Sequence, residues 1–338
     1  MLDLRTGRLH LRLMRADHLD TFTEYRNDPR LAEYQAWELP FTREQAQEIV
    51  DDQSGRDDVA DGEWTTIAVE LDGQHIGDVV AKVAGGGPVA EVGYTLRAEF
   101  QGKGYATEAT NALIDHLIAR GAHRIEGSLD DRNVPSMRVL EAVGMQYECL
   151  AKLAFPWRGE WVDDLRYSMT AAQRAAWVNR PRHAPETVEL VEITPDDARA
   201  WTRIVTHHSQ QRLVSPIANS FTDALFPELI DGAPVLPWLR GILADGERAG
   251  FMMVAAVTEA HPEPYLWRFM LDRAHQRRGI GERALGQLFA LLREQGNTSI
   301  FTSYVADVPG SPEPFYRRLG FVPTGEMDDD ETVARLTL

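Results

Sequence analysis

The chain is 338 residues long, and its 43% hydrophobic and 26% charged content is ordinary for globular protein. Its formal net charge of −17 disfavours nucleic acid or an anionic membrane as a partner and favours a cationic one, such as an amine. The single cysteine, Cys149, excludes an intramolecular disulfide, and the lack of a long apolar run argues against a signal peptide or a spanning helix, so we expect a cytoplasmic protein.

Alternation and capping patterns define the elements of the first half. Leu9, Leu11 and Leu13 alternate with polar residues, as in a strand with one buried face. Thr42-Arg43-Glu44-Gln45 is a capping box, and Asp72-Gly73 supports the positive φ of a tight hairpin turn. In chain order the patterns predict a strand at 9–13, helices from about 16 and 42, a hairpin of strands 64–71 and 74–83, a strand at 89–96, an amphipathic helix at 105–120, a strand at 124–129, a helix at 135–143 and a closing hairpin within 149–169.

A polar segment with two prolines separates this half from the next. A short helix to about Val178 is followed by Asn-Arg-Pro-Arg-His-Ala-Pro, and proline blocks the continuation of a helix or a strand. We therefore expect a first domain over residues 1–178, a linker over 179–185 and a second domain over 186–338. The second domain begins with a strand at 188–191 and a helix at Thr194, then a hairpin of strands 239–243 and 249–257 and a strand at 265–271.

One hexapeptide occurs twice, as Gln101-Gly102-Lys103-Gly104-Tyr105-Ala106 and Gln276-Arg277-Arg278-Gly279-Ile280-Gly281. Each copy follows a strand pattern and opens a helix pattern that stops at a glycine 20 residues after the Gln. A second glycine closes the next helix 43 and 44 residues after the Gln. Three landmarks in register indicate two copies of one domain, and the order of elements predicts an α+β fold with a mostly antiparallel sheet.

Glycines between a strand and a helix let backbone N–H groups approach a ligand, and the helix N-terminus adds positive potential. Pyrophosphate suits such a loop. The sequence has neither the Gly-x-x-x-x-Gly-Lys-Ser/Thr of a P-loop nor the Gly-x-Gly-x-x-Gly setting of a dinucleotide fold. Adjacent His207 and His208 on a helix would point in different directions, and the sequence has no His-Glu-x-x-His and no cysteine partner, so we expect no metal site. The acidic run 328–331 is expected to be a solvated turn.

Strand, Gln-x-x-Gly-x-(Gly/Ala), helix, strand, helix and Gly-apolar together resemble the acyl-CoA signature of the GNAT N-acetyltransferase superfamily. The first copy resembles the RimJ/RimL branch, with Glu91-Val92-Gly93-Tyr94 before the loop and Asn133-x-x-Ser136 after it. The second resembles bacterial diamine or polyamine acetyltransferases, with Arg268-Phe269-Met270 before the loop and Pro314–Phe321 after it. The resemblance covers nearly the whole chain, twice.

The resemblance implies that an amine attacks the thioester of acetyl-CoA directly. Loop N–H groups would hold the pyrophosphate, the strand ends would pair with the pantetheine arm, and Asn133 would contact coenzyme A. The residues implied in cofactor binding are Leu96, Gln101, Gly102, Lys103, Gly104, Tyr105, Ala106, Asn133, Leu271, Gln276, Arg277, Arg278, Gly279, Ile280 and Gly281.

The same resemblance implies three catalytic residues. Glu91 would act as general base through water, Ser136 would meet the leaving thiolate, and Tyr316 would be the general acid of the second copy. The alternatives are an ordinary strand carboxylate, a helix-terminus serine and a packing aromatic. The first copy has Leu140 where the second has Tyr316, and the second has Leu266 where the first has Glu91, so each copy keeps a different part of the catalytic set.

The expected acceptor is a small cationic amine, such as a polyamine or an amine-bearing antibiotic. A protein N-terminus is the alternative that the RimJ/RimL resemblance implies, and an acyl-CoA-binding regulatory module with one or both copies inactive is another. An intramolecular pseudo-dimer of the two copies is compatible with the repeat.

Overall fold

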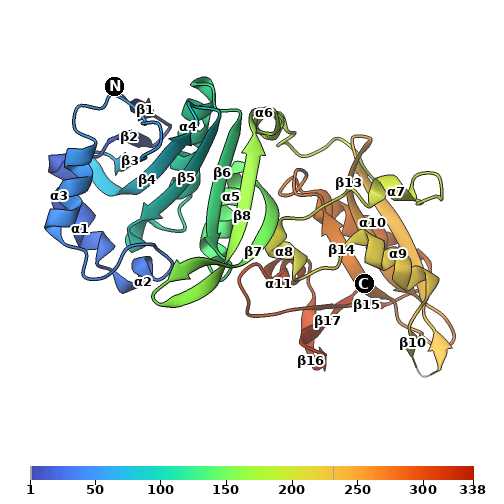
Figure 1. The fold of residues 1–338 in the computed structure, drawn as a ribbon. Helices are drawn as coiled ribbons and strands as arrows, with labels where there is room; N and C mark the ends of the chain where they lie inside the picture. Colours follow the sequence, from blue (N-terminus) through green and yellow to red (C-terminus); the bar gives the residue numbers. More distant parts are fainter. Residues whose placement is uncertain (1, 231) are drawn as a thin grey trace. The chain divides into compact units, whose positions relative to one another are not determined.

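A computed structural model describes residues 2–230 and 232–338 of the chain (Figure 1). The chain divides between Asn179 and Arg180 into two compact units, which are described separately below. Six residues of the expected linker, 180–185, therefore belong to the second unit.

The first unit holds an eight-stranded sheet in the order β1-β2-β3-β4-β5-β6-β8-β7. All neighbouring strands are antiparallel except the parallel pair β5 and β6. The elements are β1 (Asp3–Arg5), β2 (Leu9–Leu13), the 3-10 turn Ala16–His18, α1 (Leu19–Arg26), α2 (Pro29–Ala32), α3 (Arg43–Asp52), β3 (Trp64–Leu71), β4 (Gln74–Ala84), β5 (Val89–Leu96), the 3-10 turn Ala98–Phe100, α4 (Tyr105–Ala119), β6 (Arg124–Asp130), α5 (Val134–Val143), β7 (Gln146–Trp157), β8 (Glu160–Thr170) and α6 (Ala171–Asn179).

Helices cover both faces of this sheet. On one face α4 and α5 pack against residues such as Ile67 and Val69 of β3. On the other face of the sheet, α1 and α3 pack against Ala68, the residue between Ile67 and Val69. Because both faces are covered, β3 is buried continuously from Thr65 to Glu70 instead of at every second residue.

The second unit repeats this plan with seven strands in the order β16-β17-β15-β14-β13-β12-β9, beside a separate two-stranded hairpin. Its only parallel pair within the described residues is β14 with β15. The elements are β9 (Val188–Val191), α7 (Ala198–Trp201), α8 (His208–Gln211), α9 (Ile217–Leu225), β10 (Leu229–Ile230), β11 (Ala233–Pro234), β12 (Leu236–Ala244), β13 (Glu247–Ala256), β14 (Tyr265–Leu271), α10 (Ile280–Glu294), β15 (Ser299–Tyr304), α11 (Glu313–Arg318), β16 (Val322–Asp328) and β17 (Glu331–Thr337).

Most expected elements are present, and the strands before the two loops have the predicted bounds, 89–96 and 265–271. The helix predicted at Thr194 begins later. Residues 194–197 form a turn, in which the Thr194 carbonyl oxygen accepts from the Ala198 N–H at 2.9 Å and the Asp197 side chain accepts from the Thr194 N–H at 2.8 Å. The helix α7 follows from Ala198 to Trp201.

In each unit the parallel strands pair at one end and then separate. β5 and β6 pair through three positions, ending at Glu91 with Glu126. β14 and β15 pair through two, ending at Leu266 with Thr302. Beyond that point, no described strand pairs with β5 on the side of β6, or with β14 on the side of β15. Each sheet therefore contains a fork that opens toward the Gln-x-x-Gly loop.

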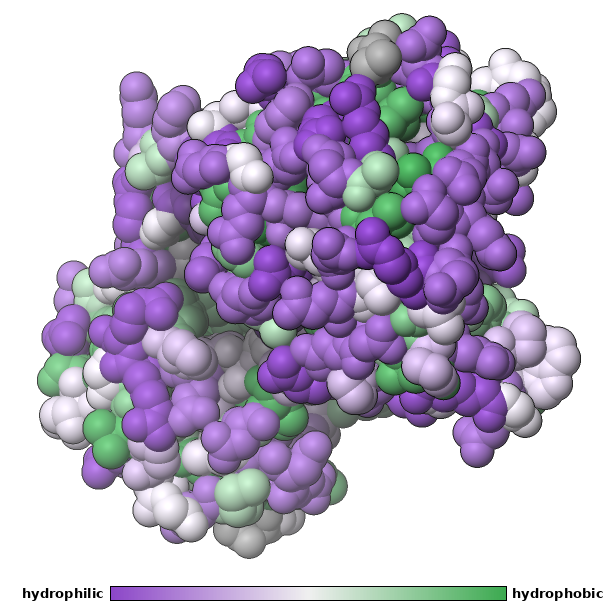
Figure 2. Space-filling view, turned by 90° about the vertical axis from the view of Figure 1, so that its left-hand side faces the viewer, coloured by the Kyte–Doolittle hydropathy of each residue, from purple (hydrophilic) through white to green (hydrophobic). Residues whose placement is uncertain are grey.

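The outer surface agrees with the composition. On the face presented in Figure 2, hydrophilic side chains predominate and apolar ones lie in small scattered groups. Among the residues that the structure describes, no helix combines the length and apolarity required to cross a lipid bilayer.

Candidate active sites

The two Gln-x-x-Gly loops share one backbone conformation. Gly104 (φ 80°) and Gly279 (φ 76°) are left-handed residues that start α4 and α10. Two positions earlier φ is again positive, 72° at Gly102 and 59° at Arg277. A left-handed residue with a side chain costs about 1–2 kcal/mol, so the glycine fixed in both motifs stands at a position where the backbone requires it.

The shared glutamine ties each loop to the strand before it. Gln101 Nε2 donates to the carbonyl oxygen of Leu96 at 2.9 Å, and Gln276 Nε2 donates to that of Leu271 at 3.2 Å. The bond spans the turn between strand end and helix start. It therefore holds the loop in place without occupying any of the loop's N–H groups.

Those N–H groups have no protein partner. In the described part of the chain, no acceptor lies within hydrogen-bonding distance of the amides of residues 102–107 or 277–282. A Cβ added at Gly102 or Gly279 would also meet no atom within 4 Å. Two rows of unpaired amides at helix N-termini, open to approach, fit an anion such as a pyrophosphate.

Cationic side chains beside the first loop are bound to the protein. Lys103 Nζ donates to the carbonyl oxygen of Glu99 at 2.8 Å. Arg8 Nε donates to Glu108 at 2.6 Å, Arg8 Nη1 donates to the carbonyl oxygen of Lys103 at 3.1 Å, and its guanidinium lies 4.4 Å from the centre of the Tyr105 ring. The backbone amides are thus the groups that this loop presents for an anion.

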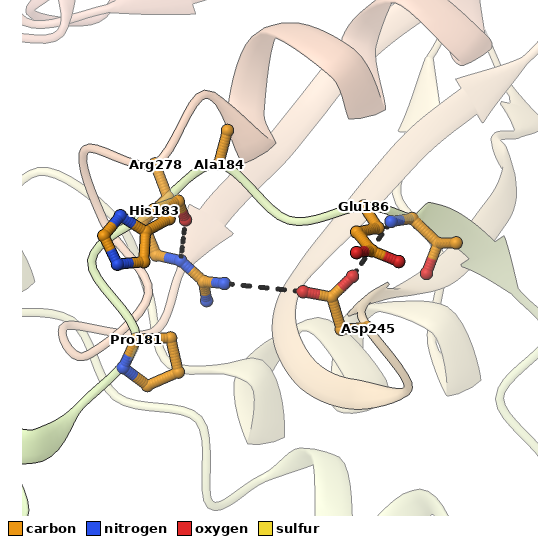
Figure 3. Close-up of a pocket in the computed structure, with 7 residues that line it drawn as sticks. Pro181, His183, Ala184, Glu186, Asp245 and Arg278 are labelled. Carbon is orange, nitrogen blue, oxygen red and sulfur yellow. Dashed lines mark hydrogen bonds and ion pairs between the residues drawn. The ribbon is translucent and has the colours of Figure 1, made fainter.

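In the second loop the side chain of Arg278 turns toward the start of the unit (Figure 3). It is 5% exposed, and Nε donates to the carbonyl oxygen of His183 at 2.8 Å while Asp245 lies 3.7 Å away. Nη1 donates to Nδ1 of His275 at 2.8 Å. Arg278, His183, Asp245 and Glu186 are among the residues that line a hollow of about 600 Å³.

The first fork carries Glu91 at the last paired position of β5. Ser128 Oγ donates to Glu91 Oε1 at 3.2 Å. Burial, helped by the negative charges of Glu126 and Asp164, raises the pKa of Glu91 above its ordinary value. A carboxylate with a raised pKa beside a cofactor loop suits a general base.

Across this fork, Ser136 and Asn133 lie at the start of α5. Asn133 caps the helix, its Oδ1 accepting from the Ser136 N–H at 3.2 Å. The Tyr94 hydroxyl, from β5, lies 2.7 Å from the Ser136 carbonyl oxygen and 2.9 Å from Ser136 Oγ. The Tyr94–Ser136 contact was not predicted from the sequence. The motif Glu91-Val92-Gly93-Tyr94 identified the strand but not what the Tyr94 hydroxyl contacts.

The second fork is built from different residues. Leu266 replaces the carboxylate, and its carbonyl oxygen accepts from Thr302 Oγ1 at 3.1 Å. Tyr316 is 6% exposed and stacks on Tyr304 with ring centres 5.5 Å apart. Burial raises the pKa of Tyr316 to about 12, and a hydrogen bond with Thr302 partly offsets this rise.

The structure therefore places Glu91 and Ser136 in the first unit and Tyr316 in the second. Within residues 2–230 and 232–338, no three His, Cys, Asp or Glu side chains are grouped to hold a metal ion. What the two units share is a forked sheet and a loop of unpaired amides at a helix N-terminus, an arrangement that suits a phosphate-bearing cofactor.

Comparisons with known proteins match both halves of the chain to acetyltransferases. The family model described as acetyltransferase (GNAT) domain matches residues 8–146, and that described as acetyltransferase (GNAT) family matches residues 199–321. The uncharacterized N-acetyltransferase p20 of Bacillus licheniformis is 30% identical over 181 residues, which cover 51% of this chain and 98% of that protein. The uncharacterized N-acetyltransferase YnaD of Bacillus subtilis is 28% identical over 167 residues, 49% and 95% of the two chains. The structure of Mycobacterium smegmatis RimJ in complex with CoA-disulfide has 26% identity and a TM-score of 0.44, covering 51% of this chain and 87% of that one.

The chain belongs to the GNAT acetyltransferase family and carries two of its domains in tandem. This confirms the family resemblance, the α+β class and the acyltransferase activity expected from the sequence. Enzymes of this family take the acetyl group from acetyl-CoA. The unpaired amides of both loops and the free edges of β5 and β14 fit the pyrophosphate and the amide-bearing arm of that cofactor.

Proposed function

We propose that the protein transfers the acetyl group of acetyl-CoA to a small cationic amine and that the reaction takes place in the first domain. One observation carries this assignment: Glu91 lies at the branch point of the first fork with a raised pKa, whereas the second fork has Leu266 there. Of the two forks in the described residues, only the first has a carboxylate on the strand before the loop, Glu91 on β5. It also has a hydroxyl group, that of Ser136, at the start of the next helix.

Glu91 would take the proton from the ammonium group of the acceptor, directly or through one water molecule. The carboxylate must be ionised to do so, and ionised carboxylates also attract a cation. Asp164 and Glu126 lie close enough to Glu91 to raise its pKa electrostatically, although each is paired with an arginine and Lys82 acts in the opposite direction. With Glu91 ionised, three carboxylates would surround the point where the amine would arrive. This favours a cationic acceptor over a neutral one.

The loop amides of residues 102–106 would hold the pyrophosphate, and the free edge of β5 near Leu96 would align the arm and receive the developing oxyanion. Acetyl-CoA supplies the acetyl thioester. Ser136 would donate a hydrogen bond to the sulfur as it leaves. The second domain would bind acetyl-CoA through residues 277–281, with Tyr316 held inside its core.

The experiment is thiol release from acetyl-CoA with three groups of acceptors: polyamines, amine-bearing antibiotics and peptides with a free N-terminus. We expect turnover with a cationic small amine and its loss in Glu91→Gln. Turnover with peptides alone would replace the proposed acceptor by a protein N-terminus. Tight acetyl-CoA binding without turnover on any amine would favour a binding module instead.

A further inference from the structure

The second cofactor loop differs from the first at one backbone position. Arg277 has a φ of 59° where the first loop has Gly102. Glycine adopts a left-handed conformation readily, whereas a residue with a side chain is strained there. Such strain persists where the surrounding structure holds the residue in place. The conformation of the second loop therefore depends on support that the first loop does not need.

The next residue supplies this support. The buried side chain of Arg278 donates from Nε to the carbonyl oxygen of His183 and from Nη1 to Nδ1 of His275, both at 2.8 Å (Figure 3). Its backbone N–H is one of the unpaired amides of the loop. One residue thus turns its amide to the anion site and its side chain to the start of the unit. At the equivalent place in the first loop, Lys103 bonds within its own turn, to Glu99.

Residues 183–186, here named the strap, are held by their carbonyl groups. Besides the bond from the loop to residue 183, Arg283 of α10 donates from Nη2 to the carbonyl oxygen of Glu186 at 2.9 Å and from Nη1 to the preceding carbonyl oxygen. The end of the strap is anchored to the turn before β13. There the Thr187 N–H donates to Asp245 Oδ1 at 2.9 Å, and the Asp245 N–H donates to the Thr187 carbonyl oxygen at 3.1 Å.

The first domain fastens the same helix position with the opposite polarity. Glu108 stands seven residues after the loop glutamine, as Arg283 does in the second domain. It accepts from the Arg8 N–H at 3.0 Å and from the Thr6 hydroxyl at 2.6 Å. In both domains this position ties the start of the unit to the helix. Only in the second domain does that start continue from the segment that joins the two domains.

The strap has little to hold it besides these hydrogen bonds. Of residues 183–186, only Pro185 is buried, and Arg283 itself is exposed. A segment with few buried side chains and solvent-exposed hydrogen bonds opens locally at a small cost in free energy. The strap can therefore leave α10 without unfolding of the domain. When it leaves, Arg278 loses its bond to residue 183, and the strained loop loses support.

We propose that the strap is a lock linked to the cofactor: acetyl-CoA bound at the second loop holds residues 183–186 on α10, and the attached strap strengthens binding of acetyl-CoA. This rests on the proposed function, in which residues 277–281 bind that cofactor. An anion on the loop amides stabilises the conformation that directs Arg278 to the strap, and linkage makes the two effects equal. Cofactor occupancy of the second domain then sets how many residues between the two domains are held.

Calorimetry on the full chain measures one side of this linkage. Gly104→Val is present in every protein compared, so that the first site is weakened and the second is measured. Arg283→Ala removes two bonds to the strap and no atom of the loop, and we expect the Kd of the second site for acetyl-CoA to rise about three- to tenfold. Arg293→Ala is the matched control, because it removes an exposed arginine from the last turn of the same helix, and it should leave this Kd unchanged.

Limited proteolysis measures the other side. Trypsin can cut after the exposed Arg182, which precedes His183, and cutting there requires an open strap, so its rate follows the open population. Saturating acetyl-CoA should slow this cut about three- to tenfold in the Gly104→Val protein and less than about twofold when Arg283→Ala is added. Binding at the second site with an unchanged Kd in Arg283→Ala, or without protection of Arg182, would overturn the lock and leave the second cofactor site standing. Absence of any binding at that site would overturn both.

Discussion

The two forks of this chain have the same backbone and different chemistry. In the first, the branch point pairs Glu91 with Glu126, and Ser128 donates to the Glu91 carboxylate. In the second, it pairs Leu266 with Thr302, whose hydroxyl is bonded to the Leu266 carbonyl oxygen. The loops that follow match in φ angles and in the Gln-to-strand hydrogen bond.

This contrast separates cofactor binding from catalysis. The loop needs only backbone amides, glycine at one position and a glutamine, and both copies have them. Proton transfer needs a titratable side chain at the fork. In the second fork Leu266 stands at the branch point, and Tyr316 is buried against a second phenol, Tyr304. A repeat of the binding motif is therefore weaker evidence for a second catalytic centre than for a second cofactor site.

The largest effect is expected from the carboxylate at the first fork. Glu91→Gln keeps the size of the side chain and removes the base, so kcat/KM should fall about 10²- to 10⁴-fold in thiol-release assays. Glu126→Gln is the matched control, because Glu126 is bound to Arg124 at 2.6 Å on the neighbouring strand. If Glu126→Gln lowers kcat/KM as much as Glu91→Gln, the base is not specifically Glu91.

The loops allow a paired test of which site turns over. Gly104→Val places a β-branched residue at φ 80°, and Gly279→Val does the same at φ 76°. The strain of about 1–2 kcal/mol should raise the KM for acetyl-CoA about 5- to 30-fold in Gly104→Val. Gly279→Val should leave kinetics unchanged and weaken one of two acetyl-CoA equivalents in calorimetry. The reverse result would place turnover in the second domain.

The pH profile follows from the raised pKa of Glu91. The base works when ionised, so a raised pKa moves the acidic limb of kcat/KM to higher pH than the ordinary glutamate value of 4.5. Below that limb, kcat/KM should fall about tenfold per pH unit. Asp164→Asn removes one negative charge that raises the pKa of Glu91, so the limb should move to lower pH. A limb unaffected by Asp164→Asn would mean that another group titrates.

The positions of the two strand-to-helix loops could be predicted from the sequence, because glycine spacing and the strand-to-helix change are local signals. That these loops bind the cofactor stays a prediction. Aligning the copies on the Gln and on the second glycine also showed that the second copy has Leu266 in place of Glu91 and the first has Leu140 in place of Tyr316. The Tyr94–Ser136 bond joins residues 42 apart and depends on how β5 meets α5, which no local pattern encodes. The direction of the Arg278 side chain could not be predicted from the sequence either. Its partner at His183 is a backbone carbonyl group, which every residue has.

Arg278 tests how the second loop is held. Arg278→Ala removes a buried side chain that is bonded to His183 and His275 and forms an ion pair with Asp245. We expect the free energy of unfolding of the second domain to fall by about 1–3 kcal/mol in urea titrations. Arg277→Ala is the control, because that neighbouring side chain is exposed, and it should change the free energy by less than about 0.5 kcal/mol. Equal effects would show that the contact with residues 181–186 does not stabilise this domain.

A change at Tyr316 should have the smallest effect on turnover. It also tests the comparison of the two forks most directly. If catalysis lies in the first domain, Tyr316→Phe changes kcat with the cationic amine by less than about twofold, because the phenol donates no proton there. The loss of its hydroxyl should appear instead as reduced stability of the second domain, since a buried polar partner, Thr302, is left behind. A fall in kcat comparable to that of Glu91→Gln would mean that a buried phenol with a pKa of about 12 serves as the acid. The second fork would then be catalytic without a strand carboxylate, and the separation of binding from catalysis drawn above would be wrong.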